Sequence, residues 1–337
     1  MTASTTPVLV SSPSGKLLPL AAALASACVC ALAQAQPYPS KPIKFVVPFP
    51  AGGDLEPVAR GLGEYFQATW GQPHIVDFKP GAQAIIGTDF VAKSAPDGHT
   101  LLVCSIGPMT INPTLYGKVP YTVGKDILPV SLVATTPMVL VAGPKLGAKT
   151  YAELIALVKA QPGKVSFASA GIGNVTHLSA ELFKRQAGLS MVHVPYKGAQ
   201  AIIADLLGGH IEMYFNPLPS ARGYVKANAE KVTPLAVTSL ARTPMLPEVP
   251  TLDELGMKGF DVNSWYGLCA PGGTPKDVVN KLAEGVAGAL AAGPFAERLR
   301  GYGMNPRANT PEQFAEQIRR ETAVWAKIIK DLNLKVE

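Results

Sequence analysis

Two glycine-containing stretches stand where an apolar strand pattern gives way to a helix pattern, and both suit the binding of an anion. The first, "VVPFPAGGDLE", spans residues 46–56, and the second, "SAGIGNVTH", spans residues 169–177. Glycines leave backbone N–H groups bare, and at a helix start these groups and the helix dipole attract negative charge. The first stretch fits a tight strand–helix turn equally well. If two such loops face each other, each wall of a cleft carries an anion site.

Neither stretch predicts a nucleotide site. The first lacks the Gly-Lys-Ser/Thr of a P-loop. The second ends in Thr rather than a third glycine, and no acidic residue closes the following strand at residues 191–196 to bind a ribose. The five histidines show no metal-ligand spacing, and no Gly-x-Ser-x-Gly elbow occurs. We therefore expect a protein that is not an enzyme and has no metal or cofactor.

Several polar side chains lie in or beside the two loops. Asp54 and Glu56 follow the first glycine pair and allow an acid/base reading, but Asp is among the best helix N-caps, so we expect Asp54 to cap the helix. His177 is expected to orient the second loop structurally. The hydroxyls of Ser169 and Thr176 lie close to the same run of backbone donors.

Composition indicates a folded chain of two lobes. The 337 residues exceed one usual core, 47% of them are hydrophobic and 16% are charged. The net charge is +6, but the basic residues are scattered and form no stripe. Nucleic-acid binding is therefore not expected.

The N-terminus reads as an export signal. Lys16 is the only charge before Lys41, an apolar stretch covers residues 17–32, and Ala33-Gln34-Ala35 offers the small residues of a cleavage site. We expect a signal peptide at 1–35 and a periplasmic protein; a membrane anchor or a lipid on Cys28 are the weaker alternatives. Cys104 and Cys269 remain after cleavage. Export permits a disulfide, but we expect two buried free thiols.

Short β-rich runs alternate with helix patterns along the rest of the chain, which predicts an α/β fold with largely parallel sheets. Without a linker, strands must cross between lobes, and we place the crossings at residues 129–143 and 264–275, two apolar runs that adjoin Pro and Gly. Lobe 1 is expected at 36–136 and 261–337, and lobe 2 at 137–260. Gly71 and Gly188 are expected helix C-caps, and Thr310 an N-cap.

Segments along nearly the whole mature chain resemble the Bug family, the periplasmic receptors of tripartite tricarboxylate transporters. The resemblance rests on "YPSKPIKFVVPFPAGG", "AKSAPDGHTLLV", "INPTLY", "HVPYKGAQAIIADLLGGHIEMYF", "PLAVTSLARTPMLPEVPTLDELG" and "SWYGLCAPGGTP". It implies a two-lobed, type II-like periplasmic-binding-protein fold with crossing hinge strands, which closes on a small organic anion. It also implies that the two glycine loops grip one ligand carboxylate, partly through ordered waters.

The resemblance places ligand contacts on both loops and on nearby positions. The expected ligand-binding residues are Phe49, Pro50, Ala51, Gly52, Gly53, Asp54, Ile106, Gly107, Ser169, Ala170, Gly171, Gly173, Asn174, Thr176, His177, Tyr196 and Asn216. The expected partners are a small organic carboxylate and the membrane subunits of a tripartite tricarboxylate transporter, with the receptor itself a monomer. A signalling receptor and an enzyme of similar architecture are the alternatives.

The chain departs from the family pattern at places that touch the ligand. Asp54-Leu55-Glu56 stands where the family commonly has Ser or Thr, then Thr, then Asp, and Asn216 stands where an Asp is frequent. The loop "SIGPMTINP" is also more apolar than usual. If Asp54 faces the ligand instead of capping the helix, it favours an ammonium or a neutral ring. An aliphatic dicarboxylate, an aromatic acid and an amino acid all stay open as ligands.

Overall fold

The structure is a computed structural model that describes residues 1–4, 6–9 and 38–334. Most of the predicted signal peptide at 1–35, including the cleavage site after Ala35, lies outside the described residues. The chain divides into two units, Met1–Ser40 and Lys41–Glu337, and the strands and helices of the described residues lie in the second. None of the described helices is long and apolar enough to cross a bilayer.

The strands form one mixed sheet. Their order is β2-β1-β3-β9-β4-β7-β5-β6, and β8 and β10 both pair with β4 outside this path. Their bounds are β1 Ile43–Val47, β2 His74–Phe78, β3 Thr100–Ser105, β4 Ile127–Ala142, β5 Ser166–Ser169, β6 Val192–Pro195, β7 Met213–Pro217, β8 Thr233–Val237, β9 Asn263–Pro271 and β10 Asn305–Pro306.

Helices follow most strands. They are α2 Leu55–Trp70, α3 Ile85–Ala92, α4 Asn112–Leu115, α5 Tyr151–Ala160, α6 Val175–Gln186, α7 Ala199–Leu207, α8 Leu218–Ala227, α9 Lys276–Ala291, α10 Pro294–Gly301 and α11 Pro311–Asp331, with a 3₁₀ turn η1 Ala82–Ala84 and a π turn η2 Gly107–Ile111. The caps confirm two predictions: Gly71 ends α2 in the left-handed region, and Thr310 begins α11 in a capping box with Gln313.

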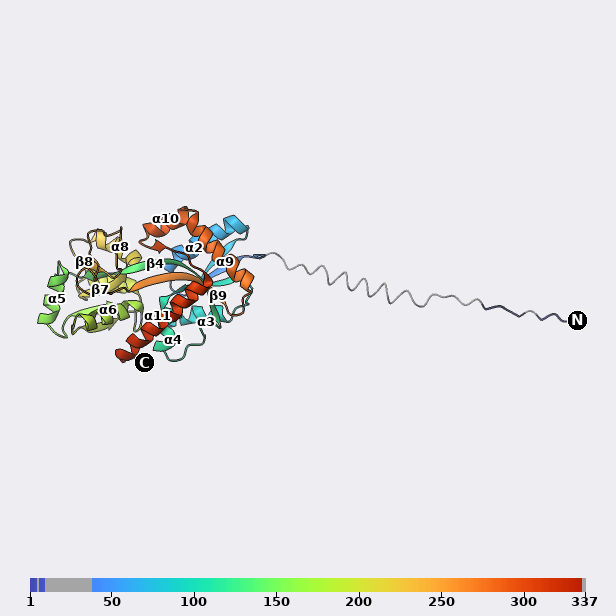
Figure 1. The fold of residues 1–337 in the computed structure, drawn as a ribbon, viewed down its shortest axis with the longest axis horizontal. Coiled ribbons are helices and arrows are strands. Elements are labelled where there is room, and N and C mark those ends of the chain that lie inside the picture. The colour runs from blue at the N-terminus through green and yellow to red at the C-terminus, as the bar shows by residue number, and fades with distance from the viewer. Residues whose placement is uncertain (5, 10–37, 335–337) are drawn as a thin grey trace. The chain divides into compact units, whose positions relative to one another are not determined.

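The long strand β4 joins two sheet regions. Up to Pro137 it pairs with β9, and from Met138 it pairs with β7. We call β1, β2, β3, β9, β10 and this first part of β4 the first sheet region, and β5–β8 with the rest of β4 the second. Figure 1 shows β4 running from the side that carries α2 and α9 to the side that carries α5 and α8. The change of partner falls next to the predicted boundary at 136/137.

The sheet is less parallel than the sequence suggests. Strand β1 pairs in parallel with β2 and β3, and β5 pairs in parallel with β6 and β7. Strands β4 and β9 pair antiparallel with each of their neighbouring strands. The two crossing strands run against their neighbours because one carries the chain into the second region and the other carries it back.

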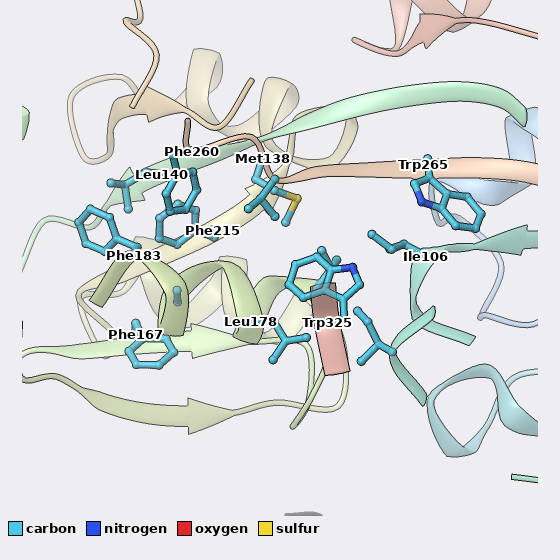
Figure 2. Close-up of a cluster of buried hydrophobic side chains, with 14 of the residues drawn as sticks. Ile106, Met138, Leu140, Phe167, Leu178, Phe183, Phe215, Phe260, Trp265 and Trp325 are labelled. Carbon is cyan, nitrogen blue, oxygen red and sulfur yellow. The ribbon is translucent and has the colours of Figure 1, made fainter. Parts of the chain in front are cut away.

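One buried cluster extends through both sheet regions. Figure 2 shows Phe167, Phe183 and Phe215 on one side, Ile106 and Trp265 on the other, and Met138 and Trp325 between them. The indole N–H of Trp265 donates to Glu321 on α11 over 2.6 Å, which satisfies the polar edge of this buried ring. Helix α11 therefore packs on the junction of the two regions.

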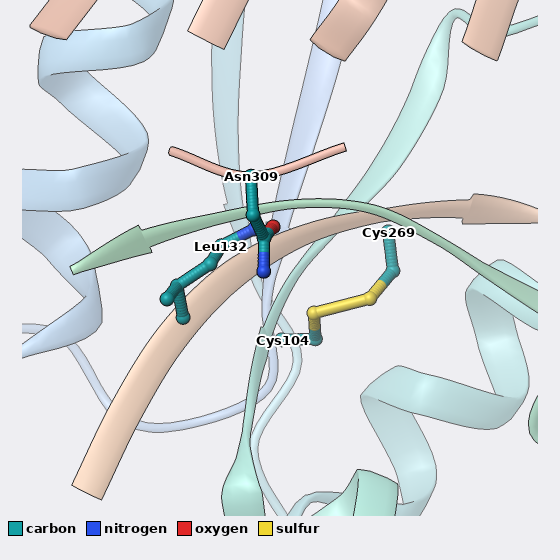
Figure 3. Close-up of a disulfide and its surroundings, with 4 residues drawn as sticks. All are labelled: Cys104, Leu132, Cys269 and Asn309. Carbon is teal, nitrogen blue, oxygen red and sulfur yellow. A yellow bond between two sulfur atoms is a disulfide. The ribbon is translucent and has the colours of Figure 1, made fainter. Parts of the chain in front are cut away.

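Cys104 and Cys269 form a disulfide, so the prediction of two free thiols was wrong (Figure 3). Strands β3 and β9 pair with Cys104 opposite Gly267, which leaves the two cysteines diagonal to each other with Cα atoms 6.1 Å apart. That separation lies within disulfide range. A sequence separation of 165 residues hid this neighbourhood, because it depends on β9 lying beside β3.

Candidate functional site

The first glycine loop connects β1 to α2 and is open. Gly52 has a φ of 82°, and a Cβ added there would meet nothing within 4 Å. Its N–H donates to the Glu56 carboxylate over 2.7 Å, and Arg60 pairs with the same side chain. These contacts, the Gly52 N–H first, lower the pKa of Glu56. The N–H groups of Gly53 and Asp54 have no hydrogen-bond partner among the described residues, so this loop presents two donors.

Asp54 does not cap α2, and that prediction was wrong. Its side chain makes no capping hydrogen bond. Instead, one carboxylate oxygen accepts the Ser220 hydroxyl over 2.9 Å and the other accepts the Tyr266 hydroxyl over 3.1 Å. The N–H groups that an N-cap usually binds are not open to Asp54, because the Glu56 N–H donates to the carbonyl of Gly53 and Pro57 has no N–H. Asp54 faces α8 and β9 instead. Burial raises the pKa of Asp54 although both hydrogen bonds oppose the shift.

The second glycine loop connects β5 to α6 and is internally bonded. The N–H of Ala170 donates to the Thr176 hydroxyl over 2.9 Å, and the N–H of Gly173 donates to Nδ1 of His177 over 3.1 Å. The N–H of Gly171 donates to Ser169, and Asn174 caps the helix by accepting from the Thr176 N–H. Ile172 keeps an N–H without a partner among the described residues. The loop is therefore held in shape before any ligand arrives.

His177 holds this loop by accepting the Gly173 N–H, which agrees with the orienting role expected for it. Its ring stacks on His193 with centroids 3.8 Å apart, and His193 stacks on Phe167. Burial is the main cause that lowers the pKa of His177 to about 3 and that of His193 to about 4. Both rings are therefore neutral at neutral pH and add no positive charge to the loop.

Gln83 connects the two sheet regions, and the sequence reasoning missed it. Its amide donates to the carbonyl of Ala170 over 3.3 Å and accepts from the Asn174 amide over 3.4 Å. Ala82, Gln83 and Ala84 have φ values of 46°, 51° and 73°, a left-handed run that non-glycine residues rarely adopt. The available signal was a third strand–glycine–helix turn, "FKPGAQAIIG", after β2.

Beyond Asp54, buried polar side chains gather at the end of β7. The Asn216 amide donates to the Tyr224 hydroxyl over 3.3 Å. The Oδ1 of Asn216 and the hydroxyl of Tyr214 are buried and have no hydrogen-bond partner among the described residues. Burial and the nearby Asp54 charge both raise the pKa of Tyr214. Such orphaned groups mark a place where a bound molecule can supply partners.

The other predicted residues lie at different depths. Ile106 belongs to the buried cluster (Figure 2), and Gly107 begins the π turn that follows it. Tyr196 donates its N–H to Ser169 and its hydroxyl to Asp205 over 2.7 Å. Phe49 is half-buried, whereas Pro50 and Ala51 are exposed. The structure thus brings Asp54 and the second loop to the junction of the regions, while Ile106 serves the core.

A cavity of about 1280 Å³ lies elsewhere, in the second sheet region. Residues from α5, α8 and the segment 245–255 line it, among them Tyr151, Val225 and Met245. None of the predicted ligand-binding residues is among its lining residues. In the described part of the chain, no cluster of His, Cys, Asp and Glu has the makings of a metal site.

The family model described as "Tripartite tricarboxylate transporter family receptor" matches residues 58–334. The chain belongs to this receptor family. It is also similar to Protein BugT of Bordetella pertussis (strain Tohama I), at 36% identity over 315 residues that cover 93% of this chain and 96% of BugT. The resemblance read from the sequence segments is confirmed.

Two solved structures with bound acids share the receptor's fold. One is R. palustris Rpa4515 with adipate, with a TM-score of 0.82, 30% identity, and coverage of 88% of this chain and 99% of that chain. The other is MatC of Rhodopseudomonas palustris with malate, with a TM-score of 0.76, 31% identity, and coverage of 87% and 100%. The predicted α/β periplasmic-binding-protein fold with crossing strands is confirmed.

Proposed function

We propose that this receptor captures a small organic carboxylate between its two sheet regions and delivers it to the membrane subunits of a tripartite tricarboxylate transporter. It works in the periplasm as a monomer, without cofactor or turnover. The sheet regions act as lobes 36–136 with 261–337 and 137–260, joined by β4 and β9. Two solved structures that resemble this chain hold adipate and malate, both of which carry carboxylates.

The observation that carries the proposal is that strand–glycine–helix turns of the first sheet region contact the second region: the turn after β2 contacts the second glycine loop, and the first glycine loop contacts α8. Gln83 and Asp54 in the first region contact Ala170 and Ser220 in the second. The unpartnered N–H groups of Gly53, Asp54 and Ile172 belong to these turns at the starts of α2 and α6. A carboxylate between them accepts charge-assisted hydrogen bonds and gains from both helix dipoles.

An enzyme on the same scaffold has little support at this site. Ser169 and His193 have the spacing of a nucleophile and its base, with 2.6 Å between Oγ and Nε2. However, Ser169 is completely buried, and its hydroxyl also lies 3.0 Å from the carbonyl of Gly171, which it can donate to. A hydroxyl without access to a substrate supports a structural role for the pair.

Ligand-induced stabilisation tests the proposal. Purified protein washed free of carried ligand is screened by thermal shift against mono- and dicarboxylates, and hits are measured by calorimetry and small-angle scattering. At 100 times the dissociation constant, a true ligand adds about 2.7 kcal/mol to the free energy of unfolding and reduces the radius of gyration. Chemical conversion of the ligand during the assay, or no binding of any carboxylate, would contradict the proposal.

A further inference from the structure

Asp54 is a carboxylate held by neutral groups alone. Its hydrogen bonds come from Ser220 and Tyr266, and no Lys, Arg or His of the described residues forms an ion pair with it. The other acid of the same loop differs. Glu56 pairs with Arg60. A buried carboxylate is costly unless a positive charge accompanies it, so Asp54 is the acid that lacks its counter-charge.

A positive group that compensates Asp54 would find further hydrogen-bond acceptors at the end of β7. Tyr214 and Asn216 are two residues apart on β7, so their side chains point to the same face of the sheet. Burial first, and then the charges of Tyr224 and Asp54, raise the pKa of the Tyr214 hydroxyl. Tyr224 in turn bonds to Asn216. The Asn216 Oδ1 can only accept, and the Tyr214 hydroxyl can accept or donate. Both are buried and without a partner among the described residues.

We propose that Asp54, Tyr214 and Asn216 form a subsite for a protonated amino group, so that the receptor prefers an amino-bearing carboxylate to the same acid without its amino group. An ammonium has three N–H donors, one for each of these acceptors. The ligand carboxylate lies at the glycine loops, as the proposed function requires, and the inference rests on that function. The subsite draws on three elements: the loop before α2, β7 and, through Tyr266, β9.

Other ligand groups fit this subsite less well. A ligand hydroxyl supplies one donor and no charge, which leaves the Asp54 carboxylate uncompensated. A second carboxylate placed there meets a like charge, which is unfavourable in a site shielded from water. Ser220 and Tyr266 use two of the roughly four lone-pair positions that a carboxylate offers, so Asp54 retains acceptor capacity for the ammonium.

Matched pairs of probes test the subsite in the wild-type protein. Calorimetry compares L-aspartate with succinate, L-glutamate with glutarate, and 2-aminoadipate with adipate. We expect the amino member of at least one pair to bind at least tenfold more tightly. Equal or tighter binding of the plain acids overturns the inference while leaving the proposed function intact. Binding of neither kind overturns both.

Two variants test whether Asp54 causes the preference for an amino group. Asp54→Asn keeps the shape and removes the charge, and it should weaken the amino ligand at least tenfold while leaving its plain counterpart unchanged or tighter. Glu56→Gln is the matched control, because it removes an acid of the same loop that is already paired, and it should keep the wild-type preference. An Asp54→Asn protein that melts like wild type and keeps the preference overturns the assignment.

Discussion

In each sheet region a buried strand is followed by a glycine loop, β1 in the first region and β5 in the second. The two loops are held in place by different contacts. In the first region a disulfide connects β3 to β9, while the glycines of the loop are exposed and the Gly52 N–H donates to the Glu56 carboxylate. In the second region the glycines are buried, and side chains of the loop and its helix bind the amides of Ala170 and Gly173. Similar sequence patterns thus give an adaptable loop in the first region and a preformed loop in the second, and these two loops form the two walls of the proposed site.

Glycine is required for different reasons on the two walls. At position 52 glycine is required only by the positive φ, since a Cβ there would meet open space. Gly173 needs it for a φ of 73° and also for room, because a Cβ there would overlap the Leu115 side chain from the other sheet region. The second loop therefore packs closely against the first sheet region, whereas the first loop does not need to.

The largest expected effect tests the covalent tie of the first region. Cys104→Ala should lower the free energy of unfolding by about 4 kcal/mol, because the disulfide closes a loop of more than a hundred residues in the unfolded chain. Urea denaturation without reductant measures this. Reduction of the wild-type protein should reproduce the loss, and an unchanged midpoint in reductant would contradict a bonded pair.

The next effect tests the close fit of the second loop. Gly173→Ala combines a left-handed backbone cost of about 1–2 kcal/mol with overpacking of about 1–3 kcal/mol. The matched Gly52→Ala should lose only the backbone part. Adding Leu115→Ala to Gly173→Ala should recover part of the loss in a double-mutant cycle. Equal losses at both glycines would remove the distinction between the walls.

The stacked histidines predict a pH dependence for the second region. His177 titrates near 6.5 when unfolded and at about 3 when folded. Between these values the unfolded state binds more protons, so stability is complete above pH 6.5 and declines as the pH falls, by up to about 1.4 kcal/mol per pH unit. Urea titrations at pH 7, 6 and 5 should show a shallower decline in His177→Gln. Parallel wild-type and variant curves would refute the assignment.

The smallest effect concerns the exposed contact of the first loop. Glu56→Gln removes the charge that accepts the Gly52 N–H and pairs with Arg60. Exposed pairs of this spacing contribute about 0.3–0.5 kcal/mol, so the melting temperature should fall only slightly, and less at high salt. A loss as large as that of Gly173→Ala would show that the first wall is as rigid as the second.

Local sequence patterns predicted the elements but not the contacts between regions. The β-rich runs predicted an α/β fold, and the two crossings placed at 129–143 and 264–275 correspond to β4 and β9. The disulfide and the role of Gln83 depend on segments far apart in the chain. Asp54 was read as a cap from its position before α2, and a tertiary contact with Ser220 overrode that preference. Residues that join the two regions are thus the least visible in sequence.

The place of β9 in the sheet sets an order of events for the growing chain. This strand lies between β3 and β4, yet all strands of the second region precede it in sequence. During synthesis from the N-terminus, the second sheet region can therefore form while the first still lacks its central strand β9. Until residues 263–271 arrive, β3 and β4 each expose an unpaired edge, which invites mispairing with other chains. Closing that gap is the long-range step, and it should limit the rate of folding.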